Sequence, residues 1–95
     1  MRKYEAMFIV KPDVEEERRN ELISKFKSII ETNGEVENID EWGIRKLAYE
    51  INKYKEGYYV LMNFKSGADL PKELERNFRI TDEVIRYMVV NVNEK

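Results

Sequence analysis

The chain has 95 residues, of which 42% are hydrophobic and 38% charged, and its formal net charge is −2. This length predicts one domain over residues 1–95 with a single core. The chain contains no Cys and no His, which excludes disulfides, thiolate or imidazole metal ligands, cysteine nucleophiles and histidine general bases. Carboxylate catalysis and an oxygen-ligand metal site stay open, but no motif in the sequence favours either, so we expect no enzyme, no cofactor and no metal.

The distribution of charge and hydropathy limits the possible partners. The mildly acidic balance predicts that any contact with nucleic acid is confined to a local basic patch. The apolar run at residues 6–10 is too short for a signal peptide or a membrane span. We therefore expect a cytoplasmic protein with no membrane partner and no small-molecule substrate.

The first half of the chain predicts a strand followed by a helix. Residues 2–10 alternate with a period of two and are apolar on both faces beyond Glu5, and Pro12 ends the strand. Asp13 is then expected to cap a helix of about twenty residues, with Glu16 in a capping-box position. Asn33-Gly34 is a typical left-handed stop.

The second half predicts two strands, a short helix and a last strand. The strands are expected at residues 36–48, with a bulge near Gly43, and at residues 58–65. A basic loop holding Lys53 and Lys55 is expected to join them. Asp69 and Pro71 begin the short helix, the last strand covers residues 84–92, and a polar tail occupies about 93–95.

This element order, βαββαβ, predicts an α+β, ferredoxin-like fold. In that fold two helices cover one face of a four-stranded antiparallel sheet with strand order 4-1-3-2. The other face stays uncovered, and here it is expected to be apolar, which indicates a binding surface. Its candidate residues are Met7, Ile9, Tyr59, Leu61 and Met88.

Cations and aromatic side chains alternate between residues 41 and 64, around Arg45, Lys46 and Tyr49. On an extended scaffold, this combination suits phosphate neutralisation and base stacking. The same residues could also cover a protein partner or form a solvated strand end. Arg2 and Arg86 lie on strands expected to be neighbours, so they could present two guanidinium groups on one side of the sheet.

Two further patterns have simpler explanations. The acidic cluster at residues 13–17 suits the positive end of a helix dipole better than a cation site. The segment from Gly57 to Phe64 resembles the octapeptide of the RNA-recognition motif only poorly, because Tyr59 replaces its small residue and Val60 one of its aromatics.

Several motifs resemble the ribosomal protein S-six family, the sixth protein of the bacterial small subunit. They are Met-Arg-Lys-Tyr-Glu at residues 1–5, Gly-Ile-Arg-Lys-Leu-Ala-Tyr at 43–49, Gly-Tyr at 57–58, and Arg-Ile followed by Asp-Glu-Val-Ile-Arg-Tyr-Met-Val-Val at 79–90. The likeness runs over nearly the whole chain. Glu50 stands where the family often has a proline, and the long acidic tail of some members is missing.

The resemblance implies a function and a set of site residues. It implies a structural component of the small (30S) subunit that binds the central domain of 16S ribosomal RNA as a heterodimer with the eighteenth small-subunit ribosomal protein. The implied RNA-side residues are Arg2, Tyr4, Arg45, Lys46, Tyr49, Lys53 and Arg86. The expected protein-partner surface comprises Met7, Ile9, Trp42, Tyr59, Leu61 and Met88.

Two alternatives belong to other classes. A free-standing RNA-recognition-type module would bind single-stranded RNA on Tyr59, and a ferredoxin-like regulatory domain would form homo-oligomers through its sheet. The charge balance favours the joint binder, since a small basic patch makes few phosphate contacts and a basic partner would add the others.

Overall fold

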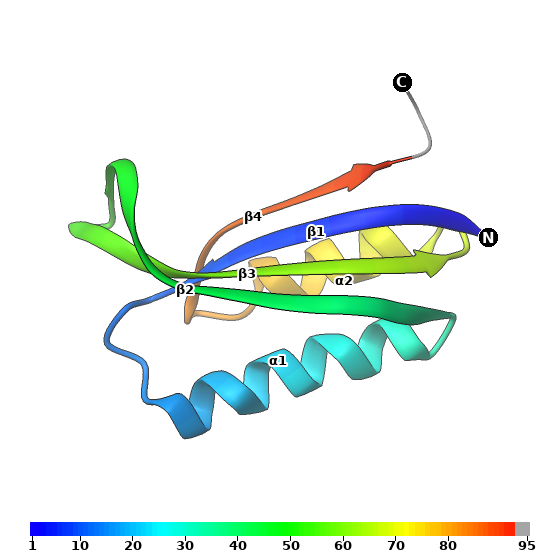
Figure 1. The fold of residues 1–95 in the computed structure, drawn as a ribbon, viewed down its shortest axis with the longest axis horizontal. Helices are drawn as coiled ribbons and strands as arrows, with labels where there is room; N and C mark the ends of the chain where they lie inside the picture. The colour runs from blue at the N-terminus through cyan, green and yellow to red at the C-terminus, as the bar shows by residue number, and fades with distance from the viewer. Residues whose placement is uncertain (93–95) are drawn as a thin grey trace.

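The computed structural model describes residues 1–92 and has six elements in the expected order (Figure 1). They are β1 (Arg2–Val10), α1 (Glu16–Glu31), β2 (Gly34–Ile51), β3 (Tyr54–Ser66), α2 (Leu70–Arg79) and β4 (Val84–Asn91). The predicted polar tail at 93–95 lies outside the described residues.

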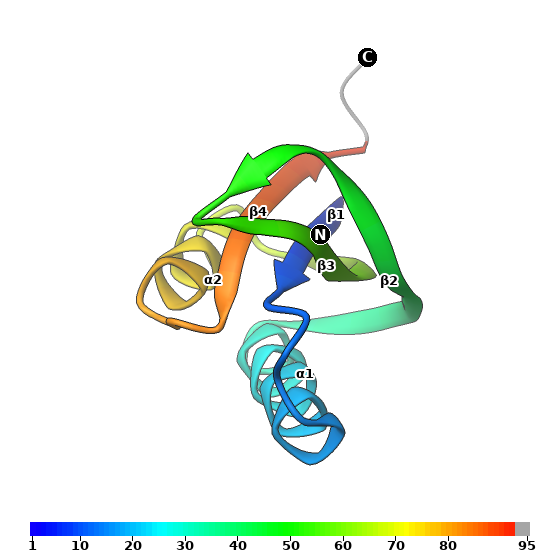
Figure 2. The same ribbon diagram turned by 90° about the vertical axis from the view of Figure 1, so that its left-hand side faces the viewer.

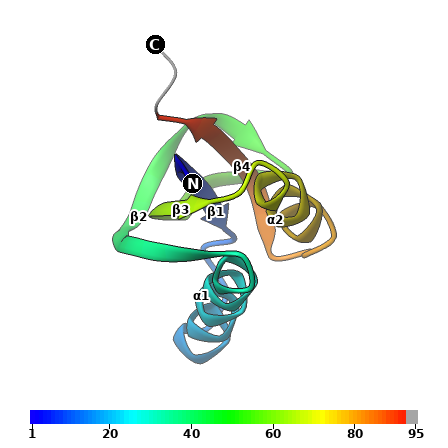
Figure 3. The same cartoon turned by 90° about the vertical axis from the view of Figure 1, so that its right-hand side faces the viewer.

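The four strands form one sheet of order β2-β3-β1-β4 in which every neighbouring pair is antiparallel. Both helices lie on the same side of this sheet (Figures 2 and 3). The predicted ferredoxin-like fold, with its strand order 4-1-3-2, is therefore confirmed.

The core lies between the sheet and the helices. Alternation in β1 turns Tyr4, Ala6, Phe8 and Val10 toward the helices, and all four are buried. The rings of Phe8, Phe26 and Phe78 meet at centroid distances of 5.0, 5.0 and 4.6 Å, so that β1, α1 and α2 share one aromatic cluster.

The ends of the first helix differ from the prediction, and the left-handed stop expected at Asn33-Gly34 is wrong, because neither residue has a positive φ. The α1 helix has 16 residues and begins after Glu15, which makes no side-chain capping bond. Asp13 lies in the preceding turn, whose Val14 N–H donates to the Lys11 carbonyl. Propensity alone does not show that Pro12 is followed by this turn before the helix starts.

The expected basic loop between β2 and β3 is instead a long hairpin with a two-residue turn. Asn52 and Lys53 have φ angles of 50° and 71°, as the primed turns of tight hairpins require. Gly43 has a φ of 84° beside a register shift, which confirms the predicted bulge. The far end of this hairpin, residues 45–57, is called the hairpin arm below.

The hairpin arm bends out of the plane of the sheet. Figures 2 and 3 show β2 rising beside the sheet and crossing over it toward β4, on the side opposite the helices. The chain itself therefore covers one end of the sheet face that carries no helix.

Candidate functional site

The helix-free face of the sheet brings together the apolar residues that the sequence singled out. In the strand register, Met7 of β1 lies between Leu61 and Met88, and Ile9 lies between Tyr59 and Arg86. Met88 is 58% exposed, while Met7, Tyr59 and Leu61 are half-buried. This face is an apolar surface that the helices leave uncovered.

The prediction of Ile9 as part of an exposed partner surface is wrong. Only 6% of Ile9 is exposed, because the hairpin arm lies over it. A Cβ atom on Gly57, in the arm, would overlap Cγ2 of Ile9. The glycine thus allows the arm to approach β1 closely.

A hollow of about 300 Å³ remains between the arm and the sheet. Its lining joins residues of both predicted classes: Met7, Ile9, Tyr59 and Met88 from the protein-partner set, Tyr49 and Arg86 from the RNA-side set, and also Leu47, Ala48 and Ile51. The sequence analysis did not single out these last three residues, since only the fold of the arm places them over β1.

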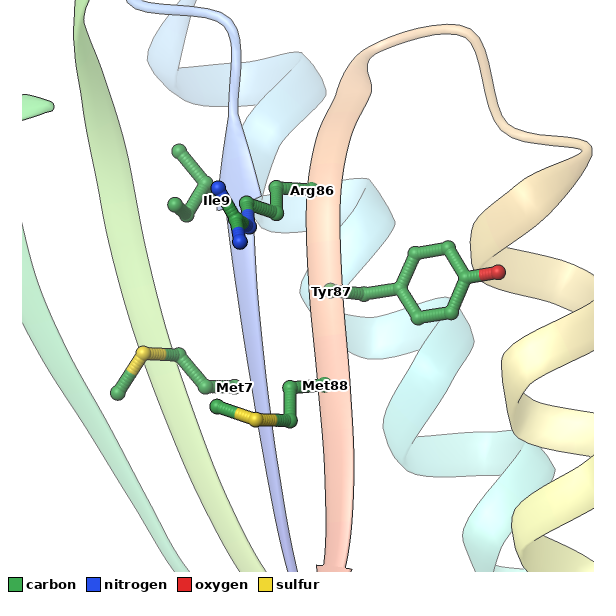
Figure 4. A pocket seen from close by; sticks show the side chains of 5 residues that line it. All are labelled: Met7, Ile9, Arg86, Tyr87 and Met88. Atoms are coloured by element: carbon green, nitrogen blue, oxygen red, sulfur yellow. The ribbon is translucent and has the colours of Figure 1, made fainter. Parts of the chain in front are cut away.

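Arg86 of β4 also lines this hollow. Figure 4 shows its side chain reaching from β4 across Ile9 of β1, whereas Tyr87 points the other way, toward α2. The Arg86 Nη1 donates a hydrogen bond of 2.6 Å to the Tyr49 hydroxyl, and its guanidinium lies 5.5 Å from the centre of that ring. Two predicted RNA-side residues, 37 positions apart, are therefore in contact.

Trp42 forms a second aromatic group on the β2 side of the face. Its ring stacks on Tyr59 at 6.2 Å with an interplanar angle of 9°, and its indole N–H donates to Asp40 Oδ2 at 3.0 Å. The Arg45 guanidinium lies 5.7 Å from the Trp42 ring, and its Nε donates to the Trp42 carbonyl at 3.4 Å. The outer nitrogens of Arg45 remain available to an anion.

Three of the predicted RNA-side cations lie at the arm end of the molecule. Arg45, Lys46 and Lys53 are all exposed there, with Lys53 in the turn at the tip. Arg2 lies at the other end of β1, where it pairs with Ser66. Seven residues of extended strand, about 23 Å, separate it from Ile9, the partner of Arg86.

The expectation that Arg2 and Arg86 share one side of the sheet is therefore wrong. Besides lying at opposite ends of β1, they face opposite ways, because Arg2 has the parity of Tyr4 and Arg86 is paired with Ile9. Neighbouring strands bring two residues together only when the antiparallel register also matches.

The prediction of Tyr4 as an RNA-side residue is also wrong. It is 7% exposed, and its ring stacks on Phe64 at 5.5 Å, on the helix-covered side of the sheet. The sequence carried the signal, since Tyr4 shares its parity with Ala6, Phe8 and Val10.

Tyr58 belongs to the helix side rather than to the cation–aromatic surface. The Arg19 guanidinium stacks 3.8 Å from the centre of its ring, and its hydroxyl donates to Glu41 Oε1 at 2.7 Å. Burial, followed by the bond to Glu41, raises the pKa of the Tyr58 hydroxyl. This contact ties α1 to the β2–β3 hairpin.

The acidic residues give no sign of a metal centre. Among the residues that the structure describes, no group of three or more Asp and Glu side chains could hold a metal ion. At the start of α1, Glu16 lies 3.9 Å from Arg19. Within residues 1–92, no helix is both long and apolar enough to span a bilayer.

Known proteins resemble this chain over its full length. The model of a family described as ribosomal protein S6 matches residues 3–91. The small ribosomal subunit protein bS6 of Alkaliphilus oremlandii is 58% identical over 94 residues, covering 99% of this chain and 100% of that protein. That of Clostridium novyi is 61% identical over 92 residues, covering 96% and 97%.

A solved structure has the same fold. The crystal structure of 30S ribosomal protein S6 from Thermotoga maritima superposes with a TM-score of 0.92 at 39% sequence identity. The match covers 98% of this chain and 89% of that one.

Proposed function

The chain belongs to the ribosomal protein S6 family, and we propose that it binds the central domain of 16S ribosomal RNA jointly with the eighteenth small-subunit protein. As a family member it is a structural component of the small ribosomal subunit in the cytoplasm, and it is not an enzyme. Its place in the ribosome makes ribosomal RNA a partner. The proposal concerns which RNA region and which protein it binds, and through which residues.

One observation carries the proposal: exposed cations and an uncovered apolar sheet face adjoin at the arm end of the molecule. Arg45, Lys46 and Lys53 are exposed at the arm, where they suit phosphate contacts. Met88 and the half-buried Met7 and Leu61 form an apolar area beside them, which suits a protein. An RNA and a protein can therefore occupy adjoining surfaces.

The charge of the chain supports RNA binding together with a partner protein rather than by this protein alone. With 17 basic and 19 acidic side chains, the protein as a whole has no net positive charge to attract RNA, so attraction depends on local groups of cations. A few phosphate contacts give weak affinity at physiological salt. A basic partner that shares the site would add the missing contacts.

A quantitative titration tests the RNA side. A central-domain fragment of 16S RNA is titrated with this protein alone, with the eighteenth protein alone, and with both. We expect tight binding only with both proteins. Arg45→Ala should weaken it and lower the salt slope by about 1, whereas Lys72→Ala, at an exposed position of α2, should change neither. Full salt-sensitive affinity of the lone protein would contradict the proposal.

A matched pair of variants tests the protein side. Met88→Glu places a charge on the apolar face and should abolish the heterodimer in analytical ultracentrifugation. Ile80→Glu makes the same change at a residue that is 59% exposed at the end of α2, and should leave the heterodimer intact. Equal effects of the two substitutions would show that the helix-free sheet face is not the surface that binds the partner protein.

The two alternatives predict other results in the same experiments. A free-standing RNA-recognition-type module needs an open Tyr59 ring, and here Trp42 stacks on that ring. Binding of short single strands by the lone protein would restore this alternative. A regulatory homo-oligomer would sediment as a dimer without any partner.

A further inference from the structure

The hairpin arm meets β4 in the hydrogen bond between Arg86 and Tyr49, above an incompletely filled space. Three features coincide there: an interrupted ladder within the arm, this polar contact at its far side, and the hollow beneath it. Each feature favours movement of the arm away from the sheet for a different physical reason.

Within the arm, the pairing of β2 with β3 is interrupted. Lys46 pairs with Glu56, but the next pair is Ile51 with Tyr54. Four residues of β2, 47–50, therefore lie opposite a single residue of β3, Lys55. A bulge of this size leaves backbone groups out of the ladder and bends the strand. The chain can change direction here without breaking the pairs that hold the central sheet.

The contact at the far side is polar and exposed. Tyr49 is 63% exposed, and its hydroxyl accepts the 2.6 Å bond from Arg86 Nη1. Among the described residues, no ion pair to a carboxylate involves Arg86. Arg86 can exchange this neutral phenol for an anion such as phosphate, because a phosphate adds an opposite charge and can accept two parallel N–H bonds from one guanidinium.

The space beneath the arm is not completely filled. The hollow of about 300 Å³ lies among Met7, Ile9, Leu47 and Tyr59, and atoms that face an unfilled volume lose the dispersion contacts of a packed core. The closed arm buries Ile9 but leaves part of the space beneath it unfilled.

We propose that the hairpin arm is a strap, held closed over the sheet face by the Tyr49–Arg86 contact, which lifts when RNA and the partner protein bind. Lifting frees the donors of Arg86 for an RNA phosphate and uncovers the apolar floor around Ile9. The role in binding rests on the proposed function, whereas the closed strap itself is a property of the free protein.

The free protein provides the first test, because the chain contains no cysteine. A single Ile9→Cys substitution places a thiol beneath the arm, where a disulfide reagent reacts with it only while the arm is lifted. Adding Tyr49→Phe removes the hydroxyl and keeps the ring. We expect the thiol to react about fivefold faster, which corresponds to the loss of one hydrogen bond. An unchanged rate overturns the proposal.

Matched controls separate lifting of the arm from general destabilisation. Tyr54→Phe makes the same chemical change in the same hairpin, away from the Arg86 contact, and should leave the Ile9→Cys rate unchanged. Val60→Cys reports opening of the helix-covered core, where Val60 is fully buried, and its rate should not respond to Tyr49→Phe. A parallel rise at Val60→Cys overturns the proposal. Leu47→Cys serves as the probe if Ile9→Cys does not fold.

The second test addresses binding. If the strap must lift, Tyr49→Phe should tighten the joint complex with the central-domain RNA and the eighteenth protein about fivefold, since the free energy of opening is then smaller. An unchanged or weaker affinity overturns the gating role, and weakening would make the Tyr49 hydroxyl a direct contact. If neither variant binds RNA, the proposed function fails, while the thiol rates still decide whether a strap exists.

Discussion

Arg18 and Glu83 form an ion pair that joins α1 to the start of β4. The Arg18 Nε donates to Glu83 Oε2 at 2.9 Å. This hydrogen bond is the largest cause that holds the pKa of Glu83 below its ordinary value. Because the folded-state pKa is lower, the pair stabilises the fold above the unfolded pKa, about 4.3, and this contribution is lost as the pH falls through the folded-state value.

Glu83→Gln should therefore change how stability depends on pH. At about pH 7 the variant should unfold at lower urea than the parent, and at an acidic pH below the folded-state pKa of Glu83 the two midpoints should converge, since Glu83 is then protonated. The difference should be small, because the pair is partly exposed. Urea titrations at both pH values measure it, and a constant offset would contradict the assignment.

Tyr4 gives a second prediction at this scale. Because its ring is packed on Phe64, Tyr4→Ala should lower the free energy of unfolding by about 3–5 kcal/mol. Tyr4→Phe keeps the packed ring, so it should leave the affinity for RNA unchanged. Chemical denaturation and the RNA titration measure the two effects. A loss of RNA affinity in a fully folded Tyr4→Phe variant would show that the Tyr4 hydroxyl takes part in RNA binding.

At the scale of the elements, the sequence predicted the strands and helices well but not the arm. Alternation in β1 and the proline that follows it act within a few residues, so a single sequence contains them. The fold-back of the arm depends on contact between Tyr49 and Arg86, and on a glycine at position 57 that fits over Ile9. No local pattern encodes such pairings, and for that reason Ile9 was expected to be exposed.

Gly57→Ala tests how closely the arm approaches β1. The added methyl would overlap Cγ2 of Ile9, so we expect a loss of about 1–3 kcal/mol in the free energy of unfolding. A double-mutant cycle with Ile9→Ala provides the control, because that substitution removes the clashing atom. The combined loss should be smaller than the sum of the single losses. Additive losses would show that the two residues are not in contact.

At the scale of the whole molecule, the aromatic cluster holds the layers together. Phe78 of α2 contacts Phe8 of β1, Phe26 of α1 and Tyr87 of β4. The overall fold was predictable because these apolar positions recur with the periods of strands and helices. The surfaces were less predictable, since exposure depends on which segments cross over them.

Phe78→Ala should therefore destabilise the whole molecule. We expect a loss of about 3–5 kcal/mol in the free energy of unfolding, since Phe78 is fully buried. Met88→Ala, at a residue that is 58% exposed, should stay within about 0.5 kcal/mol of the parent. Urea unfolding followed by circular dichroism measures both. Similar losses for the two variants would contradict the placement of the core.

The chain has a single tryptophan, Trp42, and this residue lies on the helix-free face rather than in the core. Its indole is partly in water and stacked on Tyr59, so emission from the unlabelled protein responds to whatever covers that face. Assembly can thus be followed in real time by the intrinsic fluorescence of this tryptophan, without any added label.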